Sequence, residues 1–146
     1  MNLSEFIESF QLQIKDLEKV GKLGYVDGIS DIIVQKLKEL DIKQRPMHCS
    51  DSKRETIYVK DEGIWEKEGP ANNKVKKVVG HVSKHNLNLL NSWKDLHPCC
   101  LNSNSPHNGH YLHLIKESLG GPNDMDLTES KIVKKISKEI TIDKKD

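Results

Sequence analysis

The stretch Thr56-Ile57-Tyr58-Val59-Lys60-Asp61-Glu62-Gly63-Ile64-Trp65-Glu66-Lys67 decides the fold of this 146-residue chain. β-Branched and aromatic residues dominate both of its ends, and the Asp-Glu-Gly between them has the residue types of a tight turn. The sequence therefore predicts an antiparallel hairpin of residues 56–60 and 64–67. Residues 47–49 (Met-His-Cys) offer a short third strand.

Apolar residues at helical spacing lie on both sides of this hairpin. Their period predicts helices over residues 27–40, 73–93, 111–119 and 126–140. Trp65 and Trp93 are each in phase with the apolar residues of their element, so we expect both in the core. Residues 94–109 are polar and are predicted to form a mobile loop. The fold expected for residues 25–146 is a small α+β domain, with an antiparallel hairpin of two or three strands packed against flanking helices.

Residues 1–22 predict a further amphipathic helix. Its large apolar residues follow the 4-3-4-3 spacing of a coiled-coil seam, and they are Leu3, Ile7, Phe10, Ile14 and Leu17. Asn2 is expected to cap the first turn, with Glu5 as the returning carboxylate. The run covers about two and a half heptads, fewer than the three or four that define a coiled coil with confidence. The seam therefore either docks on the chain's own domain or joins copies of the chain into a homo-oligomer.

Composition restricts the class of protein. The length suits one domain, and 35% of the residues are hydrophobic against 31% charged. No stretch approaches the ~20 apolar residues that cross a bilayer, and the N-terminus carries acids where a secretion signal carries bases. The three cysteines, Cys49, Cys99 and Cys100, are an odd number and two are adjacent, which argues against a disulfide framework. We expect neither a membrane protein nor a secreted one.

Positive charge is concentrated in the middle of the chain. Residues 43–94 contain eleven Lys/Arg and six Asp/Glu, whereas the remainder contains twelve and sixteen. On a helix, Lys77, His81 and Lys84 share a face opposite the valines. This pattern suggests phosphate binding, for which the candidate residues are Lys53, Arg54, Lys74, Lys76, Lys77, His81 and Lys84. The alternative is an ordinary solvated lysine face.

The sequence holds no recognisable catalytic or metal-binding constellation. Glycine-rich phosphate loops, His-Glu-x-x-His and Gly-x-Ser-x-Gly are all missing from it. His48 and Cys49 are neighbours on a predicted strand, so their side chains point to opposite faces and form no dyad. The histidines and cysteines of residues 97–113 lack Cys-x-x-Cys spacing. We therefore expect a non-enzymatic protein with no catalytic residue, cofactor or metal.

One segment resembles a known group of proteins. It runs Arg45-Pro46-Met47-His48-Cys49-Ser50-Asp51-Ser52-Lys53-Arg54-Glu55-Thr56-Ile57-Tyr58-Val59-Lys60-Asp61 and is followed by Trp65-Glu66-Lys67. The pattern is similar to a segment of uncharacterised proteins from giant nucleocytoplasmic DNA viruses, where a lysine-rich helix follows it and a coiled coil often precedes it. The resemblance covers about residues 30–95. It implies a viral protein in the infected host cytoplasm (the viral factory) or in the virion, and it implies no particular activity.

The leading expectation is an interaction or assembly module that self-associates through the N-terminal helix and whose partner is a second copy or another viral protein. The alternative is a nucleic-acid-binding protein that uses the basic 74–94 helix and the hairpin.

Overall fold

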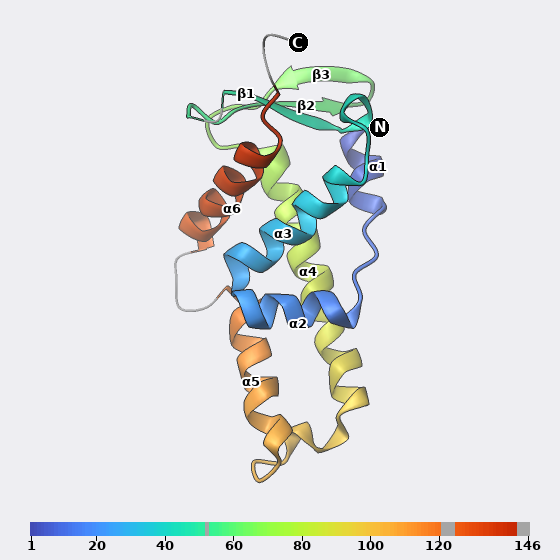
Figure 1. Cartoon of the computed structure of the whole chain (residues 1–146), viewed down its shortest axis with the longest axis vertical. Helices are drawn as coiled ribbons and strands as arrows, with labels where there is room; N and C mark the ends of the chain where they lie inside the picture. The colour runs from blue at the N-terminus through green and yellow to red at the C-terminus, as the bar shows by residue number, and fades with distance from the viewer. Residues whose placement is uncertain (52, 121–124, 143–146) are drawn as a thin grey trace.

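The computed structural model describes residues 1–51, 53–120 and 125–142. Within these ranges the chain is α+β, as expected, with six α-helices and a three-stranded antiparallel sheet at one end of an elongated molecule (Figure 1). The elements in chain order are α1 (Leu3–Glu8), α2 (Ile14–Leu23), α3 (Tyr25–Lys38), the 3₁₀ turn η1 (Ile42–Gln44), β1 (Met47–Asp51), β2 (Thr56–Asp61), β3 (Ile64–Lys67), α4 (Asn73–Leu96), the 3₁₀ turn η2 (Pro98–Leu101), α5 (Pro106–Ser118) and α6 (Met125–Glu139).

The predicted hairpin is confirmed, and the third strand is present. Glu62 and Gly63 both have positive φ, at 51° and 79°, which suits the tight two-residue turn between β2 and β3. The strand order is β1-β2-β3, with Met47 opposite Val59 in the first pair. The side-chain oxygen of Asn2 accepts a hydrogen bond from the Gly63 N–H at 2.9 Å. The start of the chain is thereby tied to the tip of the hairpin.

The two edges of the sheet differ. Residues after α6 pair with β1, because the Cys49 N–H donates to the Ile140 carbonyl at 3.2 Å and the Ile142 N–H donates to the Cys49 carbonyl at 2.9 Å. In the described part of the chain no strand pairs with the outer edge of β3. The sheet therefore has one covered edge and one open edge.

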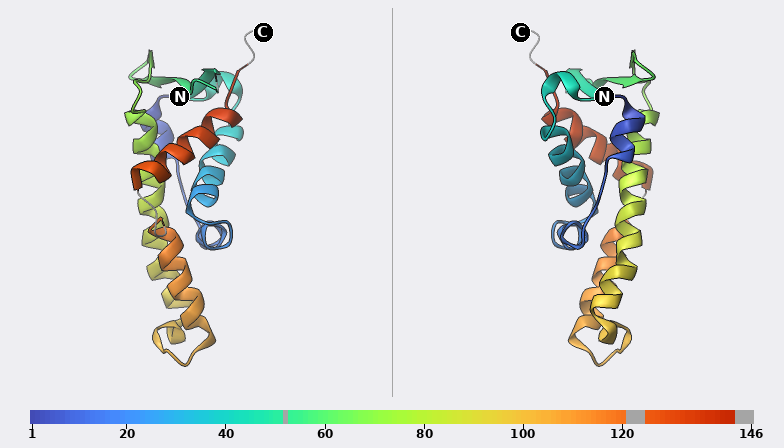
Figure 2. Two further views of the ribbon diagram at one scale, coloured as in Figure 1. Left: turned by 90° about the vertical axis from the view of Figure 1, so that its left-hand side faces the viewer. Right: turned by 90° about the vertical axis from the view of Figure 1, so that its right-hand side faces the viewer.

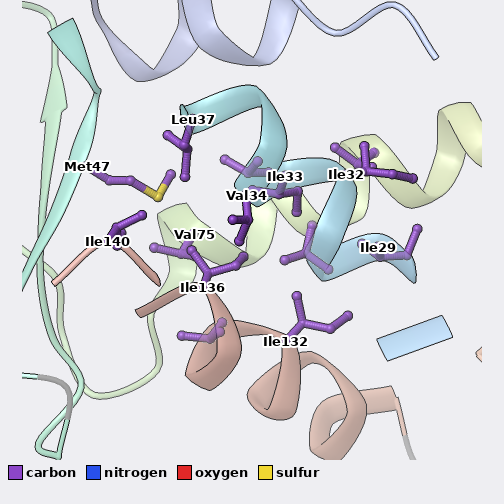
Figure 3. Close-up of a cluster of buried hydrophobic side chains, with 14 of the residues drawn as sticks. Ile29, Ile32, Ile33, Val34, Leu37, Met47, Val75, Ile132, Ile136 and Ile140 are labelled. Atoms are coloured by element: carbon purple, nitrogen blue, oxygen red, sulfur yellow. The ribbon is translucent and has the colours of Figure 1, made fainter. Parts of the chain in front are cut away.

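The main core lies beneath one face of the sheet, between α1, α3, α4 and α6 (Figure 3). Its fully buried side chains include Phe6, Ile33, Leu37 and Ile136. Each large apolar side chain removed from water in this way contributes roughly 1.5–3 kcal/mol. These four helices therefore fix which face of the sheet is turned away from solvent.

A second, smaller core lies further along the molecule, where α2 crosses α4 and α5. Trp93, Cys100 and Leu114 are buried there. The prediction of a mobile loop over residues 94–109 is wrong, since these residues include the end of α4, η2 and the first turn of α5. Pro98 and Pro106 each begin a helical turn, a position where their missing N–H costs nothing.

The N-terminal segment forms two helices where the sequence predicted one. α1 ends at Glu8, and α2 begins at Ile14 with the Gln13 N–H donating to Asp16 at 2.7 Å. Phe6 is in the main core whereas Leu17 is in the second core. The chain leaves the helical conformation between these points, and α2 then contributes Leu17 to the second core and Val20 to the main core.

Gly28 on α3 lies against α2 with no room for a side chain. A Cβ placed there would be 2.7 Å from the Cα of Val20, whereas a Cβ at Gly80 on α4 would meet no atom within 4 Å. We predict that Gly28→Ala lowers the free energy of unfolding by about 1–3 kcal/mol, because backbone must shift. Gly80→Ala, the matched control, should raise it by about 0.5–1 kcal/mol through helix propensity. Thermal unfolding measures both, and equal effects would contradict the tight crossing of α2 and α3.

Candidate nucleic-acid interface

The outer face of the sheet carries a row of aromatic side chains. Ile57 and Val59 are buried, so the alternation along β2 turns Tyr58 outward. Among the described residues, no helix covers this side of the sheet in any of the three views (Figures 1 and 2). Trp65 on β3 lies opposite Lys60, and His48 on β1 lies opposite Tyr58. Each strand therefore contributes one ring to this face of the sheet, where Tyr58 and Trp65 are exposed and His48 is half-buried.

Trp65 departs from the sequence prediction, which placed it in the core. Its exposed fraction is 41%, and that of Tyr58 is 38%. β3 is an edge strand whose four residues are all exposed, so its side chains have no second layer to pack against. The Trp65 ring instead stacks on His48, with ring centres 5.0 Å apart and an interplanar angle of 26°. The contact with His48 thus holds the Trp65 indole in place on the uncovered side of the sheet.

Two lysines lie on the same face of the sheet as the aromatic rings. Lys60 and Lys67 belong to the same outward set, since they are paired with Trp65 and Tyr58. Neither lysine is in an ion pair within the described residues. Glu66, which alternates with Lys67, belongs to the other face and pairs with Lys74 at 3.6 Å. The charge beside the rings is therefore positive.

The turn after β1 accounts for two residues predicted to bind nucleic acid. The Asp51 carboxylate accepts hydrogen bonds from the backbone N–H groups of Lys53 and Arg54, at 3.1 and 3.3 Å. Asp51 is also 3.7 Å from the Arg54 guanidinium, whose side chain is 85% exposed. The Asp51 carboxylate is therefore engaged in contacts within its own turn. The side chains of Lys53 and Arg54 are exposed to solvent at the end of the sheet.

The basic face predicted for the long helix exists on α4. Lys77 and Lys84 are exposed, His81 is half-buried, and the valines lie on the opposite side. Lys76 is half-buried, and Lys74 is engaged with Glu66. That ion pair also shows that the first turn of α4 adjoins β3. The helix lysines therefore begin at the open edge of the sheet.

The five residues of the predicted coiled-coil seam lie elsewhere. Leu3, Phe10 and Leu17 are buried, Ile7 packs against the main core, and Ile14 packs against the second. No continuous helix carries them, because α1 and α2 are separate. Three of the five side chains are therefore buried within the chain's own domain, and Ile7 and Ile14 are half-buried.

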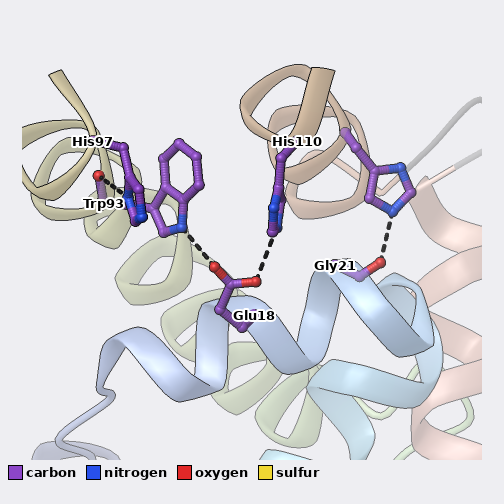
Figure 4. Close-up of polar contacts among 6 residues, drawn as sticks. Glu18, Gly21, Trp93, His97 and His110 are labelled. Carbon is purple, nitrogen blue, oxygen red and sulfur yellow. Dashed lines mark hydrogen bonds and ion pairs between the residues drawn. The ribbon is translucent and has the colours of Figure 1, made fainter. Parts of the chain in front are cut away.

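The histidines around Trp93 have structural contacts. Glu18 on α2 accepts a hydrogen bond from the Trp93 indole Nε1 at 2.6 Å and lies 2.9 Å from His110 Nε2 (Figure 4). His97 stacks on Trp93 with ring centres 4.1 Å apart. In the described ranges no group of three or more His, Cys, Asp or Glu side chains is placed to hold a metal ion. These contacts join α2 to the far ends of α4 and α5.

Comparisons with protein-family models, with curated proteins and with solved structures each find no match for this chain. None of the described helices is long and apolar enough to cross a membrane.

His48, which stacks on Trp65, also has a lowered pKa. Burial lowers the pKa of His48, and the positive charge of Arg45 lowers it further. The Arg45 Nε donates to the Leu37 carbonyl at 2.9 Å, which holds that charge in place. At neutral pH the ring that supports Trp65 is therefore mainly uncharged.

This shift predicts a pH dependence of stability. Because the folded state lowers the pKa of His48, the unfolded chain takes up the proton first as the pH falls below about 6.5. The free energy of unfolding should therefore decrease between pH 7.5 and about 5.5, and His48→Phe should make that decrease smaller. Urea titrations at several pH values measure it. An unchanged pH dependence in the variant would contradict the lowered pKa of His48.

Proposed function

We propose that this chain is a non-enzymatic nucleic-acid-binding protein that holds single strands on the outer face of its sheet. The observation that supports this most directly is the placement of Tyr58, Trp65 and His48 on one open surface beside two lysines that have no ion-pair partner among the described residues. Aromatic side chains stack on unpaired bases, and lysines neutralise the phosphates between them.

Single strands fit this surface better than a duplex. Stacking on a side chain requires an exposed base face, which base pairs in a helix conceal. The sheet presents exposed rings on neighbouring strands, and β-strands are ~4.8 Å apart. Each stacked base contributes about 1–3 kcal/mol with little dependence on its identity. We therefore expect binding with weak sequence preference.

The lysines of α4 supply longer-range attraction. Lys77 and Lys84 are exposed on a helix that starts beside β3. A strand that crosses the open edge of the sheet reaches these charges next. Their contribution is electrostatic, so it should decline as salt rises and should not depend on the base sequence.

The giant-virus resemblance stays a prediction. If it holds, the protein acts in the viral factory or within the particle. Self-association through the N-terminal helix also stays a prediction, which rests on the spacing of its five apolar residues; three of these are buried in the chain's own cores and two are half-buried.

Fluorescence anisotropy of a labelled single-stranded oligonucleotide tests the proposal. With about four phosphate contacts, the affinity should weaken about fiftyfold between ~50 and ~200 mM salt. A duplex of the same length should bind more weakly than the single strand. Equal or tighter binding of the duplex would contradict recognition through stacked bases, and no binding at low salt would exclude the function.

Substitutions on the sheet locate the site. Trp65→Ala should weaken binding of the single strand about tenfold, whereas Trp65→Phe keeps an aromatic ring and should weaken it less. Lys60→Glu with Lys67→Glu should also reduce the affinity at low salt. Lys15→Glu with Lys116→Glu is the control, because both lysines are exposed on α2 and α5, away from the sheet, and change the net charge equally (Figure 1). Equal losses in the two double variants would indicate non-specific charge attraction and contradict a defined site.

A further inference from the structure

A groove runs along the solvent side of the contact between α3 and α6, below the sheet. The two helices pack beside each other through apolar side chains such as Ile33 and Ile136 (Figures 1 and 3). On the solvent side of this contact, residues of both helices line a groove of about 750 Å³. Its floor includes Val26, Ser30 and Val34, and Leu23 stands at its margin with 47% of its surface exposed. The Ser30 hydroxyl donates to the Val26 carbonyl, so the floor presents an apolar surface without a free hydroxyl donor.

Lysines of α6 form one wall of this groove. They recur at the spacing that places side chains on one helix face, and they are Lys131, Lys134, Lys135 and Lys138. All four are exposed because their neighbours Ile132, Val133 and Ile136 fill the core. This basic stripe lies outside the region of the sequence where positive charge is concentrated.

The ion pairs leave the groove with a positive excess. Lys135 lies 2.5 Å from Asp27, and Lys38 lies 2.9 Å from Glu139. Asp31, the third carboxylate of the lining, pairs with Lys19 at 2.6 Å. Every acid of the groove therefore has a basic partner.

Three lysines of this wall have no carboxylate partner among the described residues. Within the described residues Lys131, Lys134 and Lys138 are in no ion pair. The uncompensated charge along the groove is thus entirely positive and lies beside an apolar floor.

We propose that this groove binds an acidic amphipathic helix of a protein partner. The apolar face of such a helix fits the floor, and its carboxylates meet the three unpaired lysines. From residue 131 to residue 138 an α-helix rises about 10.5 Å, so carboxylates at matching i, i+3 and i+7 positions on the partner come opposite them. The apolar floor favours this occupant over the backbone of a nucleic acid, which brings phosphates but no apolar face. The groove is distinct from the sheet surface, so the chain can hold both partners at once.

The test uses a designed probe. A labelled peptide of about 18 residues, with leucines on one helical face and glutamates beside them, is titrated against the full chain by fluorescence anisotropy. Two matched peptides replace the glutamates by glutamine or the leucines by serine. The proposal expects binding of the first peptide and clearly weaker binding of both others. Failure of the first peptide to bind at ~100 µM, or equal binding of all three, would overturn the proposal.

Variants of the chain test whether the peptide binds in this groove. Lys131→Glu, Lys134→Glu and Lys138→Glu together should weaken peptide binding at least about tenfold, and Leu23→Ser should weaken it by removing an apolar contact at the margin of the groove. Lys15→Glu, Lys43→Glu and Lys116→Glu form the control, because these exposed lysines lie outside the groove and produce the same change of charge. Circular dichroism establishes that all variants are folded. Equal losses in the two triple variants would overturn the assignment to this groove.

The oligonucleotide assay separates the two proposed surfaces. The triple variant of α6 should bind the single-stranded oligonucleotide no more weakly than the control variant does. If the α6 variant selectively loses the oligonucleotide, the lysines belong to the nucleic-acid surface and the helix-binding proposal is overturned.

Discussion

The burial of one face of a three-stranded sheet organises the rest of this structure. Met47, Cys49, Ile57 and Val59 face the helices and are wholly buried. Because side chains alternate along a strand, burying this set forces the intervening residues outward. The rings and lysines of the proposed binding surface are therefore a direct consequence of how the core is closed.

The helices that stabilise this arrangement pack around two separate hydrophobic cores. α1, α3, α6 and the first half of α4 hold the sheet, whereas α2 crosses the lower part of α4 and α5. Glu18 secures that crossing through hydrogen-bonding distance to both Trp93 and His110. The proposed binding surface on the sheet and the lysine groove of α6 are both built around the main core. The second core supports the long helix on which Lys84 is displayed.

Local sequence patterns were sufficient for most elements but not for the N-terminal helix or the 94–109 segment. The hairpin depends on residues close in sequence, and its turn chemistry identified it. The heptad-like spacing of the first residues is equally consistent with one helix or two, because Phe6 and Leu17 enter different cores and nothing local shows this. Likewise, the buried position of Cys100 depends on α5, which packs against η2. A polar composition alone therefore misassigned the segment as a loop.

The sequence by itself determined the α+β class, the hairpin over residues 56–67 and the lysine face of α4, since each follows from spacing along one segment, whereas the register came from the structure, in which Asp61 pairs with Ile64 and the turn is one residue shorter than expected. Only the tertiary structure decided that Trp65 is a surface residue stacked on His48, because an in-phase aromatic on a strand is buried only if another layer covers it. Three lysines of α6 have no ion-pair partner among the described residues, and this too could be recognised only from the fold. Their neighbours Lys135 and Lys38 are neutralised by acids on adjoining helices, and such pairing depends on how helices far apart in sequence pack together.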